Sequence, residues 1–516
     1  MKISLCYLVI CLSICAIPAN AWRSDNNIRS WGQQQLGVLI TSKLRGGADK
    51  DDAASVAVVP FLDTPPIAAR KKKALILLDT FCPYHGMFLA HRAKRIYGIT
   101  VIPVLSDYMK GYFMLRRPDD LERLLSMCMP SESEKDGWCE ALKGHDLVAI
   151  VCESDSGLAD AERLGVLLNT TYQNGVDEAR RNKYLMVERV KEAGLAVVKQ
   201  RLCKTLEEAC DFAKELGVDS GGDSDVCVVV KPIRGVGSED VTLCNDINSV
   251  KSAFQQIHGA TVFGSPREKH EVVLVQEFAI GQEFAIDVVS KNGEHKVAAV
   301  WIYDKRPANG ASFVYYATKL YDGENMDELC NYVRKTLDAL DIKWGITHNE
   351  IILTADGPRL VEVNCRQHNM DFIPLTMECI GYNIFDMLLG AYLGGEDDPF
   401  VYPMETEPER LNWDILPSNP PKRMNGAMVH LVNYANGTLT RLNEDALREI
   451  QRMPSVMNME VYPPFLQMGN TISPTIDIRT DAGWVQMVNP NPNEFQKDYD
   501  RIIELMPTLF EANDDL

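Results

Sequence analysis

Residues 345–366, GITHNEIILTADGPRLVEVNCR, constrain the fold of this chain more than any other stretch. They predict two antiparallel strands joined by a tight turn at Asp356–Gly357. Because side chains alternate along a strand, the second strand has an apolar face and a polar face. The apolar face carries Val361, Val363 and Cys365. The polar face carries Glu362, Asn364 and Arg366. A strand of this kind needs a core on one side and leaves a carboxylate, an amide and a guanidinium on the other.

The register of this hairpin predicts a metal site. With a loop at 355–357, Glu350 lies opposite Glu362 and His348 lies opposite Asn364. Two adjacent carboxylates repel unless a cation lies between them. Oxygen ligands from Glu, Glu and Asn suit Mg²⁺. The alternative is a pair of solvated strand residues, which the shared face with Asn364 disfavours. We interpret His348 as structural rather than as a base.

Alternating strands and helices predict a mixed fold, partly α/β and partly α+β. Strands at KKKALILLDT, ITVIPVLS and HDLVAIVCES alternate with helices and favour a parallel sheet. The predicted order is a signal peptide (1–21), a transit-like segment with linker (22–70), an N-terminal α/β domain (71–175), a central domain (176–395, with a lid subdomain at about 190–280) and a C-terminal α+β domain (396–516).

Composition excludes one class of partner. The chain has 516 residues and a net charge of −19, with 46% hydrophobic and 24% charged residues. Nucleic-acid binding needs clustered Lys and Arg, so this balance argues against it. Small-molecule substrates are expected instead, and the sequence leaves a homodimer open.

The N-terminus predicts targeting. An apolar run ends at the cleavage pattern ANA before Trp22, and a basic stretch with Arg23, Arg29, Lys43 and Arg45 follows. Since the apolar run is shorter than a membrane span, no span is expected in the mature form. Such a two-part segment resembles the plastid address of diatoms and related algae, and the alternative is secretion. The scattered cysteines favour free thiols in a reducing compartment.

A glycine turn after a strand predicts a phosphate contact. In VVVKPIRGVGSEDV the strand ends at Lys231, whose ammonium can reach phosphates. The turn that can present backbone N–H groups to phosphate oxygens comprises Arg234, Gly235, Gly237 and Ser238. Alone, this pattern is as typical of a plain hairpin, and it is neither a Walker loop nor a Rossmann fingerprint.

A second stretch, VQEFAIGQEFAIDV, predicts a connector between two subdomains. Glu277, Phe278 and Ala279 can face an adenine edge, a turn follows at Gly281–Glu283, and the Glu283 carboxylate can accept ribose hydroxyls. The alternative for each glutamate is a surface position at a strand end.

The order of these motifs resembles the ATP-grasp superfamily, in particular the carboxylate–amine ligases that act as L-amino-acid (dipeptide) ligases. The resemblance covers most of residues 71–516, and Glu362-x-Asn364-x-Arg366 is its most specific part. It implies an ATP-grasp fold with a Rossmann-like N-terminal domain and a two-subdomain central module. For the nucleotide, it implies that Lys183 and Lys231 contact ATP, that residues 234–238 close over the phosphates, that Glu277 and Phe278 mark the adenine hinge and that Glu283 binds ribose. It also implies that two Mg²⁺ ions, or Mn²⁺ as a substitute, are held by Glu350, Glu362 and Asn364. Arg366 would hold the acyl phosphate or the substrate carboxylate.

The reaction implied is activation of a small carboxylate by ATP, followed by attack of an amine on the acyl phosphate, with Lys231 and Arg366 as catalytic residues. The alternatives are a thiol, carrier-protein or bicarbonate acceptor, and a non-catalytic nucleotide-binding module. The segment QHNMD (367–371) departs from the family's glycine-lined substrate floor. Lys305 and Arg306 are either substrate ligands or an exposed basic pair.

Overall fold

The computed structural model describes residues 71–79, 84–116, 128–131, 134–218, 226–235, 240–262, 265–394 and 410–513. The predicted signal peptide and transit-like segment lie outside these residues, as do Gly237 and Ser238. A compact unit begins at Lys72. Among the helices described, none is both long and apolar enough to cross a bilayer. Every cysteine in the described ranges is a free thiol, as predicted.

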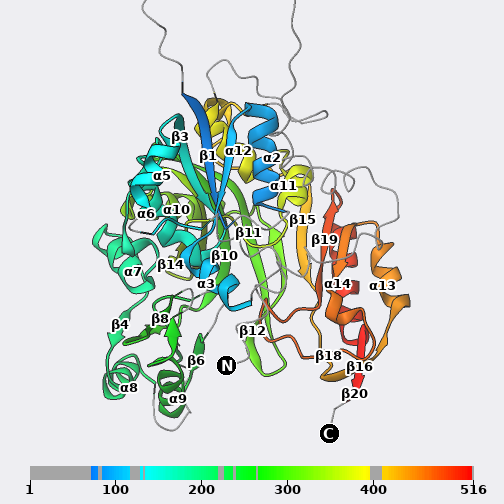
Figure 1. Ribbon diagram of the computed structural model, residues 1–516. Helices are drawn as coiled ribbons and strands as arrows, with labels where there is room; N and C mark the ends of the chain where they lie inside the picture. Colours follow the sequence, from blue (N-terminus) through cyan, green and yellow to red (C-terminus); the bar gives the residue numbers. More distant parts are fainter. Residues whose placement is uncertain are drawn as a thin grey trace, which may run out of the picture. The chain divides into compact units, whose positions relative to one another are not determined.

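The N-terminal strands form the predicted parallel sheet, in the order β2-β1-β3 (blue to cyan in Figure 1). Its strands are β1 (Lys72–Leu78), β2 (Thr100–Val104) and β3 (His145–Cys152), and its helices are α2 (Gly86–Tyr97), α3 (Asp107–Arg116), α5 (Lys135–Leu142) and α6 (Leu158–Leu168). Residues 74–78 of β1 are buried because helices cover a parallel sheet on both faces. The helix α7 (Lys183–Glu192) then leads into the next region.

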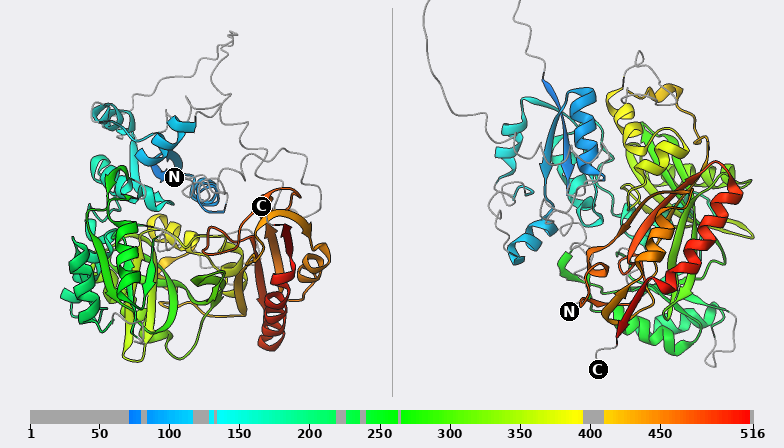
Figure 2. Two further views of the ribbon diagram at one scale, coloured as in Figure 1. Left: turned by 90° about the horizontal axis from the view of Figure 1, so that it is seen from below. Right: turned by 90° about the vertical axis from the view of Figure 1, so that its right-hand side faces the viewer.

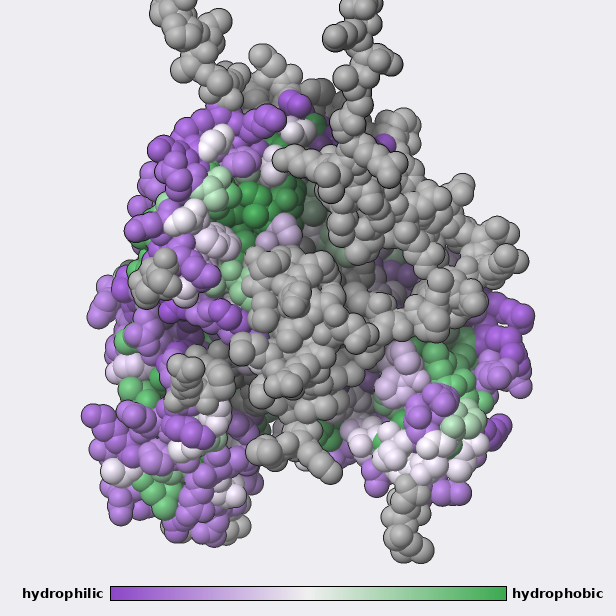
Figure 3. Space-filling model, viewed as in Figure 1, coloured by the Kyte–Doolittle hydropathy of each residue, from purple (hydrophilic) through white to green (hydrophobic). Residues whose placement is uncertain are grey.

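A small antiparallel sheet corresponds to the predicted lid subdomain. Its order is β4-β9-β5-β6. The strands are β4 (Gln200–Cys203), β5 (Val228–Lys231), β6 (Thr242–Cys244) and β9 (Val273–Glu277), with a short pair β7 (Thr261–Val262) and β8 (Ser265–Lys269). Two helices, α8 (Leu206–Glu215) and α9 (Ile247–Ile257), pack on it through one apolar cluster. On the face drawn in Figure 3, the described surface over this region is mostly hydrophilic.

An eight-stranded sheet forms the centre of the molecule, in the order β14-β13-β10-β11-β12-β15-β19-β17. Its strands are β10 (Gly281–Lys291), β11 (Glu294–Ala308), β12 (Ala311–Leu320), β13 (Gly345–Thr354), β14 (Gly357–Asn364), β15 (Asn425–His430), β17 (Val456–Val461) and β19 (Gly483–Asn489). The C-terminal α+β region thus continues this sheet, since β12 pairs with β15 (Figure 2). Its remaining elements are α13 (Glu444–Gln451), α14 (Pro492–Leu505), β16 (Gly437–Leu442), β18 (Thr471–Ile472) and β20 (Phe510–Asn513).

The two faces of the central sheet differ in what they contact. Even-numbered residues of β10, such as Phe284 and Ile286, pack under α10 (Met326–Ala339) and α7. Odd-numbered residues face the other way, where α11 (Ile373–Cys379) and α12 (Ile384–Leu393) cover part of the sheet. This second face carries Glu283 and Asp287, so period-two alternation separates the core from the polar site.

The hairpin β13–β14 has the predicted register at its polar end. Glu350 pairs with Glu362, and His348 pairs with Asn364. The predicted three-residue loop is wrong, however, because Thr354 pairs with Gly357 across a two-residue loop. A bulge at Val361 restores the register between the loop and Glu362. The bulge also removes Val361 from the core face, which Leu360 and Val363 occupy instead.

The predicted turn at Gly281–Glu283 is also wrong, because these residues begin strand β10. The connector between the sheets is therefore only 278–280. Gly281 is required at this point: a Cβ there would lie 2.1 Å from the carbonyl oxygen of Leu353 on β13.

Candidate active site

A cleft of about 190 Å³ lies between the small sheet and the polar face of the central sheet. It brings together most of the predicted site residues, although they are far apart in the sequence. Those that line it are Lys183, Lys231, Gly235, Glu277, Phe278, Glu283, Glu350, Glu362 and Arg366. Asn364 and Arg234 are not among the lining residues.

The carboxylates of Glu350 and Glu362 project from adjacent strands into this cleft. Glu362 accepts a hydrogen bond from the Asn364 amide at 2.9 Å and forms an ion pair with the Lys183 ammonium at 2.5 Å. Burial raises the pKa of Glu362, but the Lys183 charge and the hydrogen bonds from Asn364 and Lys183 together outweigh burial and hold the pKa below its ordinary value. Lys183 therefore supplies a compensating charge beside Glu362, and the metal ion between the two carboxylates stays a prediction.

Lys231, at the end of β5, is the cationic group on the opposite wall. Its side chain is buried, and it forms no ion pair within the described part of the chain. Burial, together with repulsion from Lys183, lowers its pKa to about 8. An ammonium group held in this way favours an anion in the cleft.

The predicted phosphate turn is only partly in the cleft. Gly235 lines it, and its carbonyl oxygen accepts a hydrogen bond from the Lys183 ammonium at 3.2 Å. Arg234 points elsewhere and pairs with Glu268 at 2.7 Å. The place of Arg234 in the nucleotide site stays a prediction.

The connector and the start of β10 contribute two kinds of contact. Glu277 and Phe278 line the cleft where the two sheets meet, the predicted position for an adenine hinge. Glu283 lies deeper, and both of its carboxylate oxygens accept from the Lys305 ammonium at 2.7 Å. Lys305 also lies over the rings of Tyr303 and Tyr315, at 4.8 and 4.3 Å.

The predicted basic pair separates because adjacent strand residues face opposite ways. Lys305 lines the cleft, whereas Arg306 contacts Asp304 and Tyr499 on the other face of β11. The interpretation as an exposed basic pair is therefore wrong for Lys305.

Arg366 connects the cleft to the N-terminal domain. Its guanidinium is buried and donates to the Asp155 carboxylate at 2.5 Å and to the Gln367 carbonyl at 2.9 Å. Asp155 follows strand β3, so the N-terminal sheet orients a side chain of the central site. Sequence patterns did not reveal this pairing, because 211 residues separate the partners.

Other cleft residues were missed. Tyr303 and Tyr315 come from the hairpin β11–β12. The alternation of Trp301, Tyr303 and Lys305 along one strand face was the sequence pattern that could have identified Tyr303 as a cleft residue. His368 and Met370 belong to the divergent segment 367–371 and also line the cleft.

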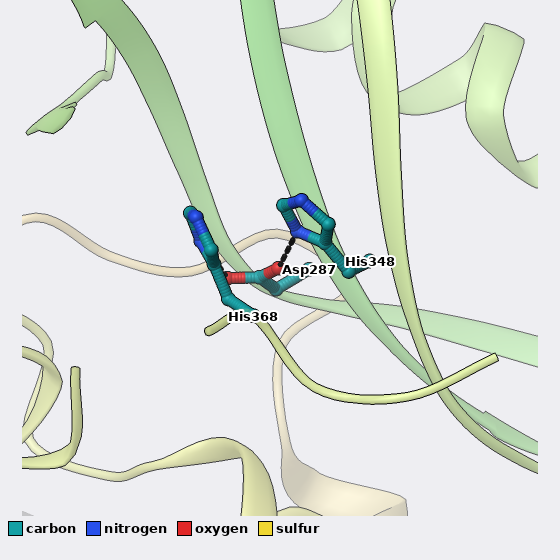
Figure 4. A group of neighbouring side chains, drawn as sticks. All are labelled: Asp287, His348 and His368. Atoms are coloured by element: carbon teal, nitrogen blue, oxygen red, sulfur yellow. Dashed lines mark hydrogen bonds and ion pairs between the residues drawn. The ribbon is translucent and has the colours of Figure 1, made fainter. Parts of the chain in front are cut away.

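A buried cluster lies next to Glu350. The Asp287 carboxylate lies between the imidazole rings of His348 and His368 (Figure 4). Its oxygens are 2.9 Å from His348 Nδ1 and 3.6 Å from His368 Nδ1. Burial disfavours a charged His348, but hydrogen bonds to Asp287 and Glu350 raise its pKa to about 9. Burial, then repulsion from His348, lowers the pKa of His368 to about 4. His348 thus contacts both Asp287 and Glu350, and its structural role stays an interpretation.

The segment 367–371 is held by two residues from other parts of the chain, His85 and Gln486. The His85 ring donates to the Met370 carbonyl at 2.8 Å, and the Gln367 amide contacts the same ring at 3.2 Å. The Gln486 amide donates to the Asp371 carbonyl at 2.6 Å. Met370 has a φ of 73°, an uncommon value for an unbranched apolar residue, which these contacts maintain.

Asp371 provides a pH-dependent prediction. Burial raises its pKa to about 7, with a further contribution from Glu460. Because the folded chain binds this proton more tightly than the unfolded chain, the free energy of unfolding falls as the pH rises from about 4 to about 7. Asp371→Asn should remove this loss and stabilise the protein by roughly 2 kcal/mol at pH 8, with no gain at pH 4. Urea unfolding of both proteins at the two pH values measures the difference. An equal effect at both values would contradict it.

Comparisons with known proteins agree with this geometry. Residues 224–371 match the ATP-grasp domain family. Dapdiamide A synthase of Enterobacter agglomerans is 27% identical over 328 residues, covering 59% of this chain and 74% of that protein. The structure of an L-amino acid ligase from Bacillus licheniformis superposes with a TM-score of 0.60 at 17% identity, covering 87% of this chain and all of that one (100%).

A second solved structure contains a nucleotide. N5-carboxyaminoimidazole synthetase from Staphylococcus aureus, complexed with ADP, has a TM-score of 0.53 at 14% identity and covers 85% of this chain and 99% of that one. At these identities the structures establish the fold, and the resemblance read from the motifs is confirmed. The chain therefore contains an ATP-grasp domain at residues 224–371, and it is similar in sequence to a dapdiamide synthase and in fold to an L-amino acid ligase.

Proposed function

We propose that this protein is an ADP-forming ligase that activates a small carboxylate, such as that of an amino acid, as an acyl phosphate and joins it to an amine. One observation carries the proposal: a single cleft holds the carboxylate pair Glu350 and Glu362, the ammonium groups of Lys183 and Lys231, and the guanidinium of Arg366. Phosphoryl transfer needs charge neutralisation and positioning more than a protein nucleophile. The related dapdiamide synthase supports the same class of reaction.

The residues of the cleft divide this work between its two walls. Lys231 and Lys183 bind the phosphates, and Glu277 and Phe278 hold the base at the connector. Arg366, oriented by Asp155, holds the carboxylate of the substrate and then its acyl phosphate. The amine attacks the acyl carbon, phosphate leaves, and the aromatic rings of Tyr303 and Tyr315 restrict water at that end.

Metal binding belongs to the proposal as well. The donor set fits Mg²⁺, since Glu350 and Glu362 are paired across adjacent strands and Asn364 touches Glu362. These three residues would hold two ions, with Mn²⁺ as a substitute, which supply charge neutralisation at the phosphates. The Lys183 ammonium, which pairs with Glu362 here, would then be free to turn to the phosphates.

The test is ADP release by the purified protein with ATP, Mg²⁺ and a panel of amino acids, singly and in pairs, followed by mass measurement of the products. We expect ADP to appear only when Mg²⁺ and a productive carboxylate are both present, with a product mass equal to the two substrates minus water. Tight ATP binding without ADP release for any pair would leave the non-catalytic reading. ADP release that requires an added thiol would identify a different acceptor.

We further propose plastid targeting through residues 1–70. Two observations support this proposal: the sequence pattern of the N-terminus and the free thiols of the described domains. A fluorescent protein fused after residue 50 should accumulate in plastids of an algal host, and its secretion into the medium would refute this address.

A further inference from the structure

The cluster of Asp287, His348 and His368 has a geometry that the ligase reaction does not explain. Within the described residues, these three form the group of carboxylate and imidazole side chains whose ligand atoms all lie within 4.8 Å of one another. All three are largely buried, with side-chain exposures of 7%, 4% and 10%. They come from separate segments: Asp287 pairs with His348 across β10 and β13, and His368 comes from the segment after β14.

The distances suit a metal ion. Ligand atoms about 2.0–2.1 Å from a tetrahedral ion lie about 3.3 Å apart. The two nitrogen–oxygen separations bracket that value: 2.9 Å from His348 Nδ1 to Asp287 Oδ1, and 3.6 Å from His368 Nδ1 to Asp287 Oδ2. Figure 4 shows the carboxylate of Asp287 between the two imidazole rings. His368 Nδ1 is buried and has no hydrogen-bond partner among the residues that the structure describes, so a ligand atom is available beside Asp287.

The surroundings have the arrangement that supports metal-bound histidines, whose second nitrogen is commonly held by a carboxylate or another acceptor. His348 Nε2 lies 3.4 Å from Glu350, and His368 Nε2 lies 3.4 Å from the Tyr303 hydroxyl. The Trp301 indole donates to Asp287 at 2.8 Å. A small cavity of about 20 Å³ borders Asp287 and His368, which is room for about one water molecule as a fourth ligand.

We propose that Asp287, His348 and His368 bind one divalent transition-metal ion, with Zn²⁺ as the best match. Two imidazoles and one carboxylate favour Zn²⁺ and neighbouring late metals over Mg²⁺, which prefers oxygen ligands. On binding, the proton on His348 Nδ1 passes to solvent and the metal takes its place beside the carboxylate. The ion ties β10 and β13 to the segment that carries His368 and Met370, and so stiffens one wall of the cleft.

The test uses the full chain, purified without a polyhistidine tag, loaded with Zn²⁺ in excess Mg²⁺ and freed of unbound metal. Elemental analysis should find about one Zn²⁺ per chain. Titration with Co²⁺ should produce the visible absorption of a nitrogen-ligated site, which the carboxylate pair occupied by Mg²⁺ does not give. His368→Gln should weaken binding by at least about 100-fold, beyond the roughly 10–100-fold cost of losing an outer-shell partner.

His430→Gln is the matched control. His430 and Asp481 form an equally buried pair at 2.7 Å, but they belong to no three-ligand group in the described part of the chain. This variant should keep its Zn²⁺. Asp287→Asn should lose the bound Zn²⁺. If Asp287→Asn does not fold, His368→Gln still tests the site, because His368 is the most exposed of the three residues. Less than about 0.1 Zn²⁺ per chain, or equal binding by wild type and His368→Gln, would overturn the proposal, whatever the outcome of the ADP assay.

Discussion

Glu362→Gln is expected to reduce ADP release by at least about 1000-fold, because metal-assisted phosphoryl transfer depends on several kcal/mol of charge stabilisation. Glutamine keeps the size of the side chain but removes the charge that would hold Mg²⁺ beside Glu350. Initial rates at saturating ATP measure the loss. Binding of Mn²⁺, followed by electron paramagnetic resonance in the absence of turnover, should weaken in parallel.

The fold should survive this substitution. Glutamine ends the repulsion between residues 350 and 362, while Lys183 loses one partner and keeps its hydrogen bond to Gly235. We therefore expect thermal unfolding within a few degrees of the wild type. Glu444→Gln, at an exposed position of α13, is the control for loss of a negative charge and should be fully active. Wild-type turnover by Glu362→Gln would refute the metal assignment.

Lys231→Met is expected to weaken ATP binding by roughly 30- to 100-fold, since a charged contact to a phosphate contributes about 2–3 kcal/mol. Methionine keeps the apolar stem that is buried at the end of β5. In the ATP-free protein the substitution removes a buried ammonium that lacks an ion pair among the described residues, so the free energy of unfolding should not fall. Lys231→Met should thus weaken ATP binding without lowering the free energy of unfolding.

Calorimetric titration with ATP and urea unfolding without it measure the two effects. Lys251→Met, at an exposed position of α9 in the same subdomain, controls for the loss of one positive charge and should change neither. If Lys231→Met binds ATP as the wild type does, this lysine does not contact the nucleotide. A large loss of stability would show instead that its ammonium is satisfied within the fold.

Local patterns predicted much of this molecule, for reasons that can be named. Alternation along β14 identified Glu362, Asn364 and Arg366 as one polar set, and the hairpin register placed Glu350 opposite Glu362. Both follow from the geometry of two neighbouring strands. The bulge at Val361 was not predicted, because a wrong loop length and an extra residue cancel before Glu362 is reached.

The sequence by itself determined which residues share a strand face, where the parallel layer begins and which motifs stand in the order of an ATP-grasp protein. These depend on interactions between near neighbours, whose spacing the chain itself sets. Only the tertiary structure decided that Asp155 orients Arg366, that Lys305 faces Glu283, and that Asp287 lies between two histidines. Those contacts join segments whose separation in space depends on how sheets and loops pack, and no short-range periodicity carries that information.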